Sequence, residues 1–194
     1  MEIFKYDSYG HYLRSQIEGN LKKIDRIVQR NISYVREKTI KEIVKRKKDA
    51  ERVLCHGTRN AKEQIFFKKY LPNAYVIGSE VSTNAAEFPM TVEHDFNKIK
   101  REWVNSFDIL YSNSFDHSIT PKETLSVWKN QLNKNGLLFL EHTVVKKNHI
   151  SDATDPLKIE KQELIDMIDS IGMNIIEEFQ SATNHAYILV CEKK

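Results

Sequence analysis

The sequence predicts an α/β fold, in which a mostly parallel sheet of seven strands carries helices on both faces. Two patterns support this prediction. After residue 50, short runs of β-branched and aromatic residues alternate five times with amphipathic helical patterns. The last two runs follow each other across a short loop, which predicts one antiparallel strand at the edge of the sheet. A chain of 194 residues that is 40% hydrophobic can bury such a core without disulfides.

The first fifty residues are expected to be helical. Apolar side chains recur there every three or four residues, which is the spacing of one face of a helix. These positions are Leu13, Ile17, Leu21, Ile24, Val28, Ile32, Val35, Ile40, Ile43 and Val44. The spacing slips near Arg36–Thr39, so we expect two helices or one kinked helix. The sequence thus divides into a helical part, residues 1–50, and an α/β domain, residues 51–194.

The remaining elements follow in order from apolar runs and turn residues. The expected strands are Arg52–Cys55, Ala74–Gly78, Thr91–His94, Phe107–Tyr111, Leu137–Glu141, Asn174–Phe179 and Ala186–Cys191. The expected helices are Ala61–Tyr70, a short helix or turn at Thr83–Glu87, Pro121–Leu132 and Ile159–Ile171. Proline is favoured in the first turn of a helix, and Asn135-Gly136 is a C-cap signal after the third of them.

Polar residues stand at the ends of the five strands that are expected to be parallel. They are His56-Gly57, Glu80, Asp95, the segment Asn113–His117 and the segment Glu141–Thr143. In open α/β sheets, ligands bind outside the carboxyl ends of the strands. The sequence therefore predicts a binding site at this edge of the sheet.

Composition argues against several other classes of protein. No stretch approaches the ~18 apolar residues of a membrane span, and the start of the sequence lacks the apolar region of a signal peptide. Cys55 and Cys191 lie in apolar runs without zinc-ligand spacing, so we expect reduced core thiols, no metal site and a cytoplasmic protein.

Charge is distributed unevenly along the chain. Residues 1–50 hold 13 of the 30 Lys and Arg residues but only 7 of the 27 Asp and Glu residues. Such a basic segment could attract an anionic substrate or a nucleic acid. The alternative is an ordinary solvated helix face. Nothing in the pattern indicates an oligomeric state.

The strand ends also follow a recognisable order. The run Val53–Glu63 contains a strand, Gly57 and the start of a helix, and Glu80 comes about 23 residues after Gly57. Later, Phe107–Pro121 gives a strand, an acid–histidine pair and a helix start, and Lys134–His142 gives a lysine–glycine turn and a strand. In order and spacing, residues 51–193 resemble the class I S-adenosylmethionine-dependent methyltransferases.

This resemblance implies a Rossmann-like sheet with an N-terminal helical cap, the cofactor S-adenosyl-L-methionine, and methyl transfer to a small molecule. The implied cofactor-binding residues are His56, Gly57, Thr58, Arg59, Glu80, Asp95, Phe96, Ser112 and Asn113. Gly57 would let the backbone approach the cofactor closely. Glu80 could accept two hydrogen bonds from ribose hydroxyls, and Asp95 one from the adenine amino group.

Candidate catalysts follow the fourth and fifth expected strands. His117, beside Asp116, and His142, beside Glu141, could each act as a general base toward an oxygen or carbon acceptor. A neighbouring carboxylate would orient the imidazole and raise its basicity. The alternatives are that Asp116 and His117 stabilise a loop and that His142 is a hydrogen-bonded core histidine.

The glycine-rich loop departs from the family pattern. Cys55 stands where the family usually has an acid, and Arg59 and Ala61 stand where it has glycines. A non-catalytic scaffold of the same fold therefore remains an alternative, as does an RNA-binding module that uses the basic segment. A nicotinamide dehydrogenase is disfavoured because the loop lacks the G-x-G-x-x-G spacing.

Overall fold

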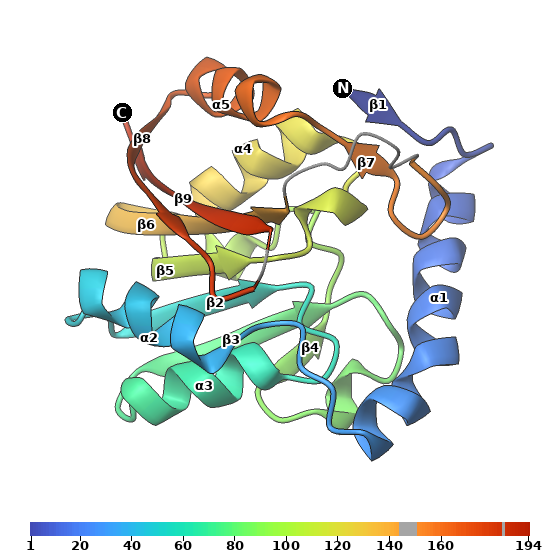
Figure 1. Cartoon of the computed structure of the whole chain (residues 1–194), viewed down its shortest axis with the longest axis horizontal. Coiled ribbons are helices and arrows are strands. Elements are labelled where there is room, and N and C mark those ends of the chain that lie inside the picture. The colour runs from blue at the N-terminus through green and yellow to red at the C-terminus, as the bar shows by residue number, and fades with distance from the viewer. Residues whose placement is uncertain (144–150, 184) are drawn as a thin grey trace.

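The computed structural model describes residues 1–143, 151–183 and 185–194 and has a seven-stranded sheet at its centre (Figure 1). The strand order is β4-β3-β2-β5-β6-β9-β8. The strands are β2 Arg52–His56, β3 Tyr75–Glu80, β4 Thr91–Glu93, β5 Phe107–Ser112, β6 Leu132–Thr143, β8 Met173–Gln180 and β9 Ala186–Lys193. Strand β9 runs antiparallel to both neighbours, β6 and β8. The predicted fold class is confirmed, with the antiparallel strand lying next to the edge strand β8.

Helices cover both faces of the sheet (Figure 1). Helices α2 (Glu37–Arg46) and α3 (Lys62–Tyr70) pack on one face, where Ile40, Ile43 and Phe67 share a core with β2 and β5. Helices α4 (Pro121–Gln131) and α5 (Lys161–Ser170) pack on the other face, in the core around Trp128. Helix α2 belongs to residues 1–50 but shares a core with the sheet of residues 51–194. The division of the chain into two domains at residue 50 therefore remains a prediction.

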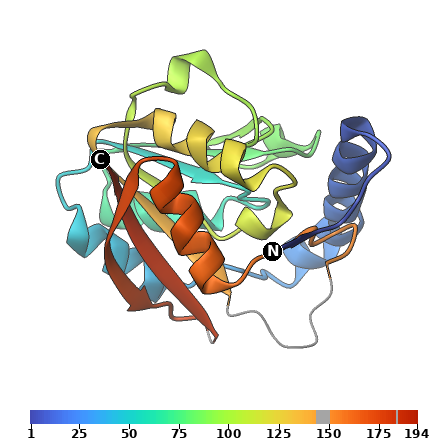
Figure 2. The ribbon, with the colours of Figure 1, turned by 90° about the horizontal axis from the view of Figure 1, so that it is seen from above.

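Helix α1 (Tyr9–Gln29) lies apart from these layers, across the carboxyl ends of the parallel strands (Figures 1 and 2). It begins after Ser8, whose side chain accepts a hydrogen bond of 3.1 Å from the backbone N–H of His11. The predicted break in the helical pattern is confirmed, and it falls between Gln29 and Glu37. Figure 2 shows that α1 stands on one side of the molecule.

Several short elements differ from the prediction. Strand β1 (Glu2–Ile3) pairs antiparallel with β7 (Leu157–Lys158), which no sequence pattern indicated. The short helix or turn predicted at Thr83–Glu87 is the 3-10 helix η1 (Ala85–Glu87), whereas the 3-10 helices η2 (Arg101–Trp103) and η3 (Phe115–His117) were not predicted. Among the described residues, no helix has both the length and the apolar character that crossing a membrane requires.

The expected helix cap at Asn135-Gly136 is wrong, because β6 already begins at Leu132. Pairing of β5 with β6 shifts register between Phe107 and Ile109. The backbone at Gly136 comes so close to β5 that an added Cβ would lie 2.5 Å from the carbonyl oxygen of Phe107. The glycine therefore allows a close approach of two strands rather than the end of a helix.

Candidate functional site

Two cavities meet at the turn after β2. The first, called here the Glu80 pocket, has a volume of about 40 Å³. It is lined by Tyr12, Gln16, Asn20, Gly57, Arg59, Glu80, Val81, Asp95, Phe96, Ser114 and His117. The second, called here the acidic chamber, has a volume of about 350 Å³. It is lined by Lys23, Tyr34, Gly57, Thr58, Arg59, Asn60, Glu63, Asn113, Ser114, Asp116, His117, Glu141, Thr143, Asp155 and Thr183.

The turn after β2 requires glycine at its first position. Gly57 has a φ of +72°, and an added Cβ would lie 2.5 Å from the Cβ of Ser114. The hydroxyl of Ser114 donates a hydrogen bond of 3.1 Å to the carbonyl of Gly57. This contact joins the ends of β2 and β5, and it leaves the bare backbone of Gly57 facing both cavities.

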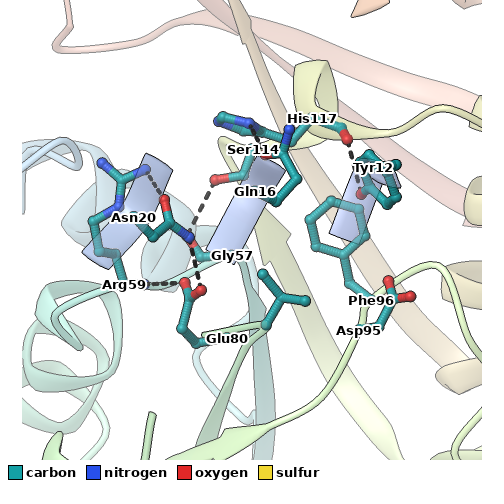
Figure 3. Close-up of a pocket in the computed structure, with 11 residues that line it drawn as sticks. Tyr12, Gln16, Asn20, Gly57, Arg59, Glu80, Asp95, Phe96, Ser114 and His117 are labelled. Carbon is teal, nitrogen blue, oxygen red and sulfur yellow. Dashed lines mark hydrogen bonds between the residues drawn. The ribbon is translucent and has the colours of Figure 1, made fainter. Parts of the chain in front are cut away.

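Glu80 ends β3 as a buried carboxylate with several donors (Figure 3). Its Oε2 accepts a hydrogen bond of 3.0 Å from the backbone N–H of Arg59. Its Oε1 accepts hydrogen bonds from the backbone and hydroxyl of Ser82 and from the amide of Asn20, at 2.9, 2.8 and 2.9 Å. The other end of the Asn20 side chain accepts a hydrogen bond from the Arg59 guanidinium. Helix α1 thus reaches into the pocket between Arg59 and Glu80.

Asp95 and Phe96 follow β4 on the other side of the pocket. One oxygen of Asp95 accepts hydrogen bonds of 3.0 and 2.8 Å from the backbone and side-chain amides of Asn97. The other oxygen accepts a hydrogen bond from the hydroxyl of Tyr9 on α1. Burial and this carboxylate raise the pKa of Tyr9 above its usual range, so the phenol keeps its proton as a donor. Asp95 therefore also holds α1.

In the loop between Gly57 and α3, two residues that carry side chains adopt the positive-φ backbone conformation that glycine favours. Arg59 and Ala61 have φ values of 41° and 60°, in the left-handed region. Non-glycine residues pay a steric cost there of roughly 1–2 kcal/mol each. The loop therefore keeps the conformation that glycines would favour, and the Arg59 guanidinium stacks on the ring of Tyr34 at 5.2 Å.

Glu63 and Glu141 bring two buried carboxyl groups to the acidic chamber. Glu141 accepts hydrogen bonds of 2.5 Å from the hydroxyls of both Tyr111 and Ser181. Glu63, on the first turn of α3, has one oxygen that is buried without a hydrogen-bond partner. Burial, with a smaller contribution from Glu141, raises the pKa of Glu63 to about 8. Glu63 is consequently protonated at neutral pH.

His117 lines both cavities and contacts α1. Its Nδ1 lies 2.9 Å from the carbonyl oxygen of the Gln16 side chain, an atom that can only accept a hydrogen bond. In the neutral imidazole this contact places the proton on Nδ1 and leaves a lone pair on Nε2. Nε2 faces Asp116 and Asp155 at 4.0 and 3.8 Å. Ligand atoms of these three residues lie within 4.8 Å of one another, although both carboxylates are about 40% exposed, with side-chain values of 41% and 44%.

The two cavities bring together nine of the twelve candidate residues. These are Gly57, Thr58, Arg59, Glu80, Asp95, Phe96, Asn113, Asp116 and His117. The side chains of the other three, His56, Ser112 and His142, lie in the core instead.

Each of these three core side chains has its own hydrogen-bond partner. The ring of His56 lies between Ser79 and Gln131, with distances of 2.7 and 2.8 Å, and burial lowers its pKa to about 3. Ser112 donates a hydrogen bond of 3.1 Å to the carbonyl of His56. His142 is 6% exposed, and its Nε2 lies 3.2 Å from the carbonyl of Ile159. For His142, the alternative of a hydrogen-bonded core histidine agrees with this placement.

Sequence reasoning missed the polar face of α1 and the buried acid of α3. Tyr12, Gln16 and Asn20 are spaced by four residues, which places them on one helical face. That spacing was a readable signal beside the more obvious apolar stripe. Glu63 carries no comparable signal, because an acid in the first turn of a helix is common on protein surfaces.

Part of the basic N-terminal segment is neutralised by neighbouring acids. Lys45 pairs with Glu42 at 2.7 Å, and Arg46 pairs with Glu177 of β8 at 2.5 Å. These contacts agree with an ordinary solvated helix face for this part of α2.

Comparison with solved structures gives strong likeness of fold at low sequence identity. Burkholderia thailandensis 1,6-didemethyltoxoflavin-N1-methyltransferase, solved with 1,6-didemethyltoxoflavin and S-adenosylhomocysteine, superposes with a TM-score of 0.77 at 10% identity, over 98% of this chain and 92% of that one. The [4+2]-cyclase SpnF superposes with a TM-score of 0.75 at 10% identity, over 99% of this chain and 98% of that one. A TehB-like SAM-dependent methyltransferase from Corynebacterium glutamicum superposes with a TM-score of 0.65 at 12% identity, over 93% of this chain and 100% of that one.

Sequence comparison adds nothing to this likeness. Neither a protein-family model nor a curated protein matches the sequence. The strand order, the helices on both faces and these superpositions lead to one conclusion. The chain has the fold of the class I S-adenosylmethionine-dependent methyltransferases.

Proposed function

We propose that the protein binds S-adenosylmethionine across the two cavities and transfers its methyl group to a small molecule. The observation that carries this proposal is the buried carboxylate of Glu80, which ends β3 and is held by the backbone of the turn after β2. A carboxylate at this place in an α/β sheet suits a ribose diol. Structures with the same fold, including that of 1,6-didemethyltoxoflavin-N1-methyltransferase, were solved with S-adenosylhomocysteine bound.

The donor chemistry of both cavities fits the cofactor. Asp95 can accept from an adenine amino group, and the ring of Phe96 lines the same pocket. At the opposite side, the Arg59 guanidinium and the first turn of α3 offer donors to a carboxylate. When bound, the cofactor supplies an activated methyl group on a sulfonium, and the chain supplies position and exclusion of water.

The space in the Glu80 pocket fits the cofactor only after α1 moves. A cavity of about 40 Å³ holds one or two water molecules rather than a nucleoside. The side chains of Gln16 and Asn20 occupy the pocket, and Asn20 already donates to Glu80. We therefore propose that α1 is a cover that releases Glu80 when the cofactor enters.

His117 is the better placed of the two candidate bases. It lines both cavities and presents the lone pair of Nε2, whereas Nε2 of His142 faces the backbone of Ile159. We propose that His117 accepts the proton that an acceptor loses, with Gln16 holding its tautomer. The core position of His142 favours a structural role for this residue.

Calorimetry with S-adenosylhomocysteine tests the proposal directly. The wild-type protein is expected to bind, and Glu80→Ala is expected to lose on the order of 2–3 kcal/mol of binding free energy with the ribose hydrogen bonds. Glu93→Ala, an exposed acid at the end of the neighbouring β4, is the matched control and should bind normally. Unchanged affinity in Glu80→Ala would remove Glu80 from the cofactor site.

A non-catalytic or differently catalytic member of the same fold is the second candidate. The small free volume beside Glu80 favours it, and so does the fold likeness to a protein described as a [4+2]-cyclase. The same titration separates the candidates. Absence of any S-adenosylmethionine or S-adenosylhomocysteine binding would favour a scaffold, and binding without methyl transfer to any acceptor would favour another chemistry.

A further inference from the structure

The acidic chamber has a composition unlike that of the Glu80 pocket. Four carboxyl groups line it, from Glu63, Asp116, Glu141 and Asp155. Among the residues that the structure describes, the lysine and arginine residues along its wall are Lys23 and Arg59. Lys23 is exposed on α1, and the Arg59 guanidinium is already bonded to Asn20 and stacked on Tyr34. The chamber therefore presents an excess of hydrogen-bond acceptors and negative charge.

Glu63 shows independently that a hydrogen-bond partner is missing among the described residues. Its side chain is 4% exposed, and its Oε2 is buried without a hydrogen-bond partner. Buried carboxyl oxygens are nearly always paired, because desolvation without a partner costs free energy. Burial also raises the pKa of Glu63, and the nearby Arg59 offsets only part of this effect. A donor that enters the chamber would supply a partner that the described residues do not supply.

His117 adds an acceptor at the mouth shared by the two cavities. Its Nε2 lone pair and the carboxylates of Asp116 and Asp155 converge, with Nε2 4.0 and 3.8 Å from the two carboxylate oxygens. With a neutral imidazole, these are three acceptors with no donor between them among the described residues, and such groups repel each other. An ammonium group carries three N–H donors and a positive charge, so it matches this arrangement, whereas a carboxylate or phosphate would be repelled.

We infer that the side of the acidic chamber lined by Asp116, His117 and Asp155 binds an organic amine as its ammonium ion, next to the cofactor at the Gly57 and Arg59 side. This inference rests on the proposed function, in which the amine is the methyl acceptor. The cavity volume of about 350 Å³ suits a small metabolite rather than a macromolecule. On transfer, the ammonium first gives one proton to Nε2 of His117. The nitrogen lone pair then forms the bond to the methyl carbon, and the electron pair of the broken carbon–sulfur bond stays on sulfur.

Matched ligands that differ only in charge test the inference. One set is butane-1,4-diamine, butane-1,4-diol and succinate, and a second is 2-phenylethylamine, 2-phenylethanol and phenylacetate. Each is titrated into the full-length protein at pH 7, with and without saturating S-adenosylhomocysteine, by calorimetry and thermal shift. The expected result is binding of an amine at least about 10-fold tighter than its alcohol, with no binding of the acids.

Two double variants locate the binding. Asp116→Asn with Asp155→Asn should weaken amine binding by about 10-fold or more, while S-adenosylhomocysteine affinity stays within about 2-fold. Glu123→Gln with Asp166→Asn removes the same charge from exposed positions on α4 and α5 and should change neither affinity. Retained amine affinity in the chamber variant would overturn the inference.

The remaining outcomes separate this inference from the proposed function. A protein that binds S-adenosylhomocysteine but binds alcohols or acids as well as amines, or binds no amine, contradicts the inference alone. A protein that never binds S-adenosylhomocysteine contradicts the proposed function, whatever the amines do. Stabilisation by Mg²⁺ or Zn²⁺, abolished by the chamber variant and unmatched by any amine, would assign these carboxylates to a metal ion instead and overturn the inference.

Discussion

Helices α1 and α2 come from the same apolar pattern in the sequence but are held in opposite ways. Helix α2 buries Ile40, Ile43 and Val44 completely or nearly so, in a core shared with the sheet. Helix α1 leaves Leu21 and Val28 exposed, at 38% and 54%. Helix α1 does bury Tyr12, Gln16 and Ile27, and side-chain hydrogen bonds connect it to the strand ends. They join Tyr9 to Asp95, Tyr12 to the backbone of His117, Gln16 to His117 and Asn20 to Glu80.

This difference assigns the two helices different roles. Removing a helix from an apolar core costs roughly 25 cal/mol for each Å² of apolar surface exposed. A helix held by polar contacts exchanges them for water, at a net cost of only about 0.5–1.5 kcal/mol each. Helix α2 is therefore part of the folded body. Helix α1 can leave the strand ends without unfolding that body, as the proposed cover requires.

Core substitutions give the largest expected contrast. Ile43→Ala should lower the free energy of unfolding by about 4 kcal/mol, because it leaves a cavity beside the sheet. Leu21→Ala should change it by less than about 0.5 kcal/mol, because that side chain is already exposed. Urea denaturation of the two variants measures both values. A large loss in Leu21→Ala would mean that α1 packs as α2 does.

The buried Glu63 gives the body a pH dependence that α1 should not share. Its pKa is raised to about 8 in the folded protein, while an unfolded glutamate ionises near 4.5. The folded state therefore holds a proton that the unfolded state releases, and stability falls as pH rises from about 4.5 to about 8. The difference in unfolding free energy between Glu63→Gln and wild type should therefore shift in favour of the variant by on the order of 3 kcal/mol from pH 5 to pH 8.

Urea denaturation at pH 5, 6.5 and 8 measures this change, with exposed Glu123→Gln as the control. Amide exchange measures the local opening of α1. After correction for intrinsic exchange, the free energy of this opening should have the same pH dependence in both variants. Equal stability of Glu63→Gln and wild type at all three pH values would show that Glu63 is ionised in the folded protein.

Asn20 tests whether α1 competes with the cofactor. Asn20→Ala frees the lone pair of Glu80 that its amide now occupies and opens the Glu80 pocket. Affinity for S-adenosylhomocysteine should therefore rise by about 5-fold, equivalent to about 1 kcal/mol, with unchanged stability of the body. Lys22→Ala, on the exposed side of the same helix, is the matched control. Weaker binding in Asn20→Ala would make Asn20 a cofactor ligand rather than a competitor.

The smallest expected effect is at Tyr9. Tyr9→Phe removes one hydrogen bond to Asp95 while the ring keeps its place. Amides of α1 should exchange about 3- to 5-fold faster, equivalent to roughly 0.5–1 kcal/mol, and amides of α2 should not change. Faster exchange in both helices would indicate that they open together.

Most of the fold followed from the sequence, because strands and helices have local periodicity. The run Val53–Cys55 is apolar throughout, and its strand is buried on both faces. Pairing of β1 with β7 joins segments more than 150 residues apart, and each strand has only two residues. Such short strands contain too few residues for a pattern. The early start of β6 depended on the approach of Gly136 to another strand, which no local signal records.

For the candidate site, the sequence located residues that follow strands and failed where placement depends on packing. Glu80 is the last residue of β3 and Asp95 lies two residues after β4, so the topology brings them to one edge. His56 occupies an equivalent place, yet its ring turns inward onto Trp128 at a centroid distance of 5.0 Å. The choice between pocket and core depends on the neighbouring side chains, which come from other parts of the chain.

The position of β9 affects how the protein is made. This strand follows every other strand in the chain, yet it lies between β6 and β8. Until residues 186–193 leave the ribosome, one edge of β6 is unpaired, although side chains of this strand such as Phe139 and Leu140 are buried in the folded protein. The sheet can therefore close over the edge of β6 only after this last strand has been made.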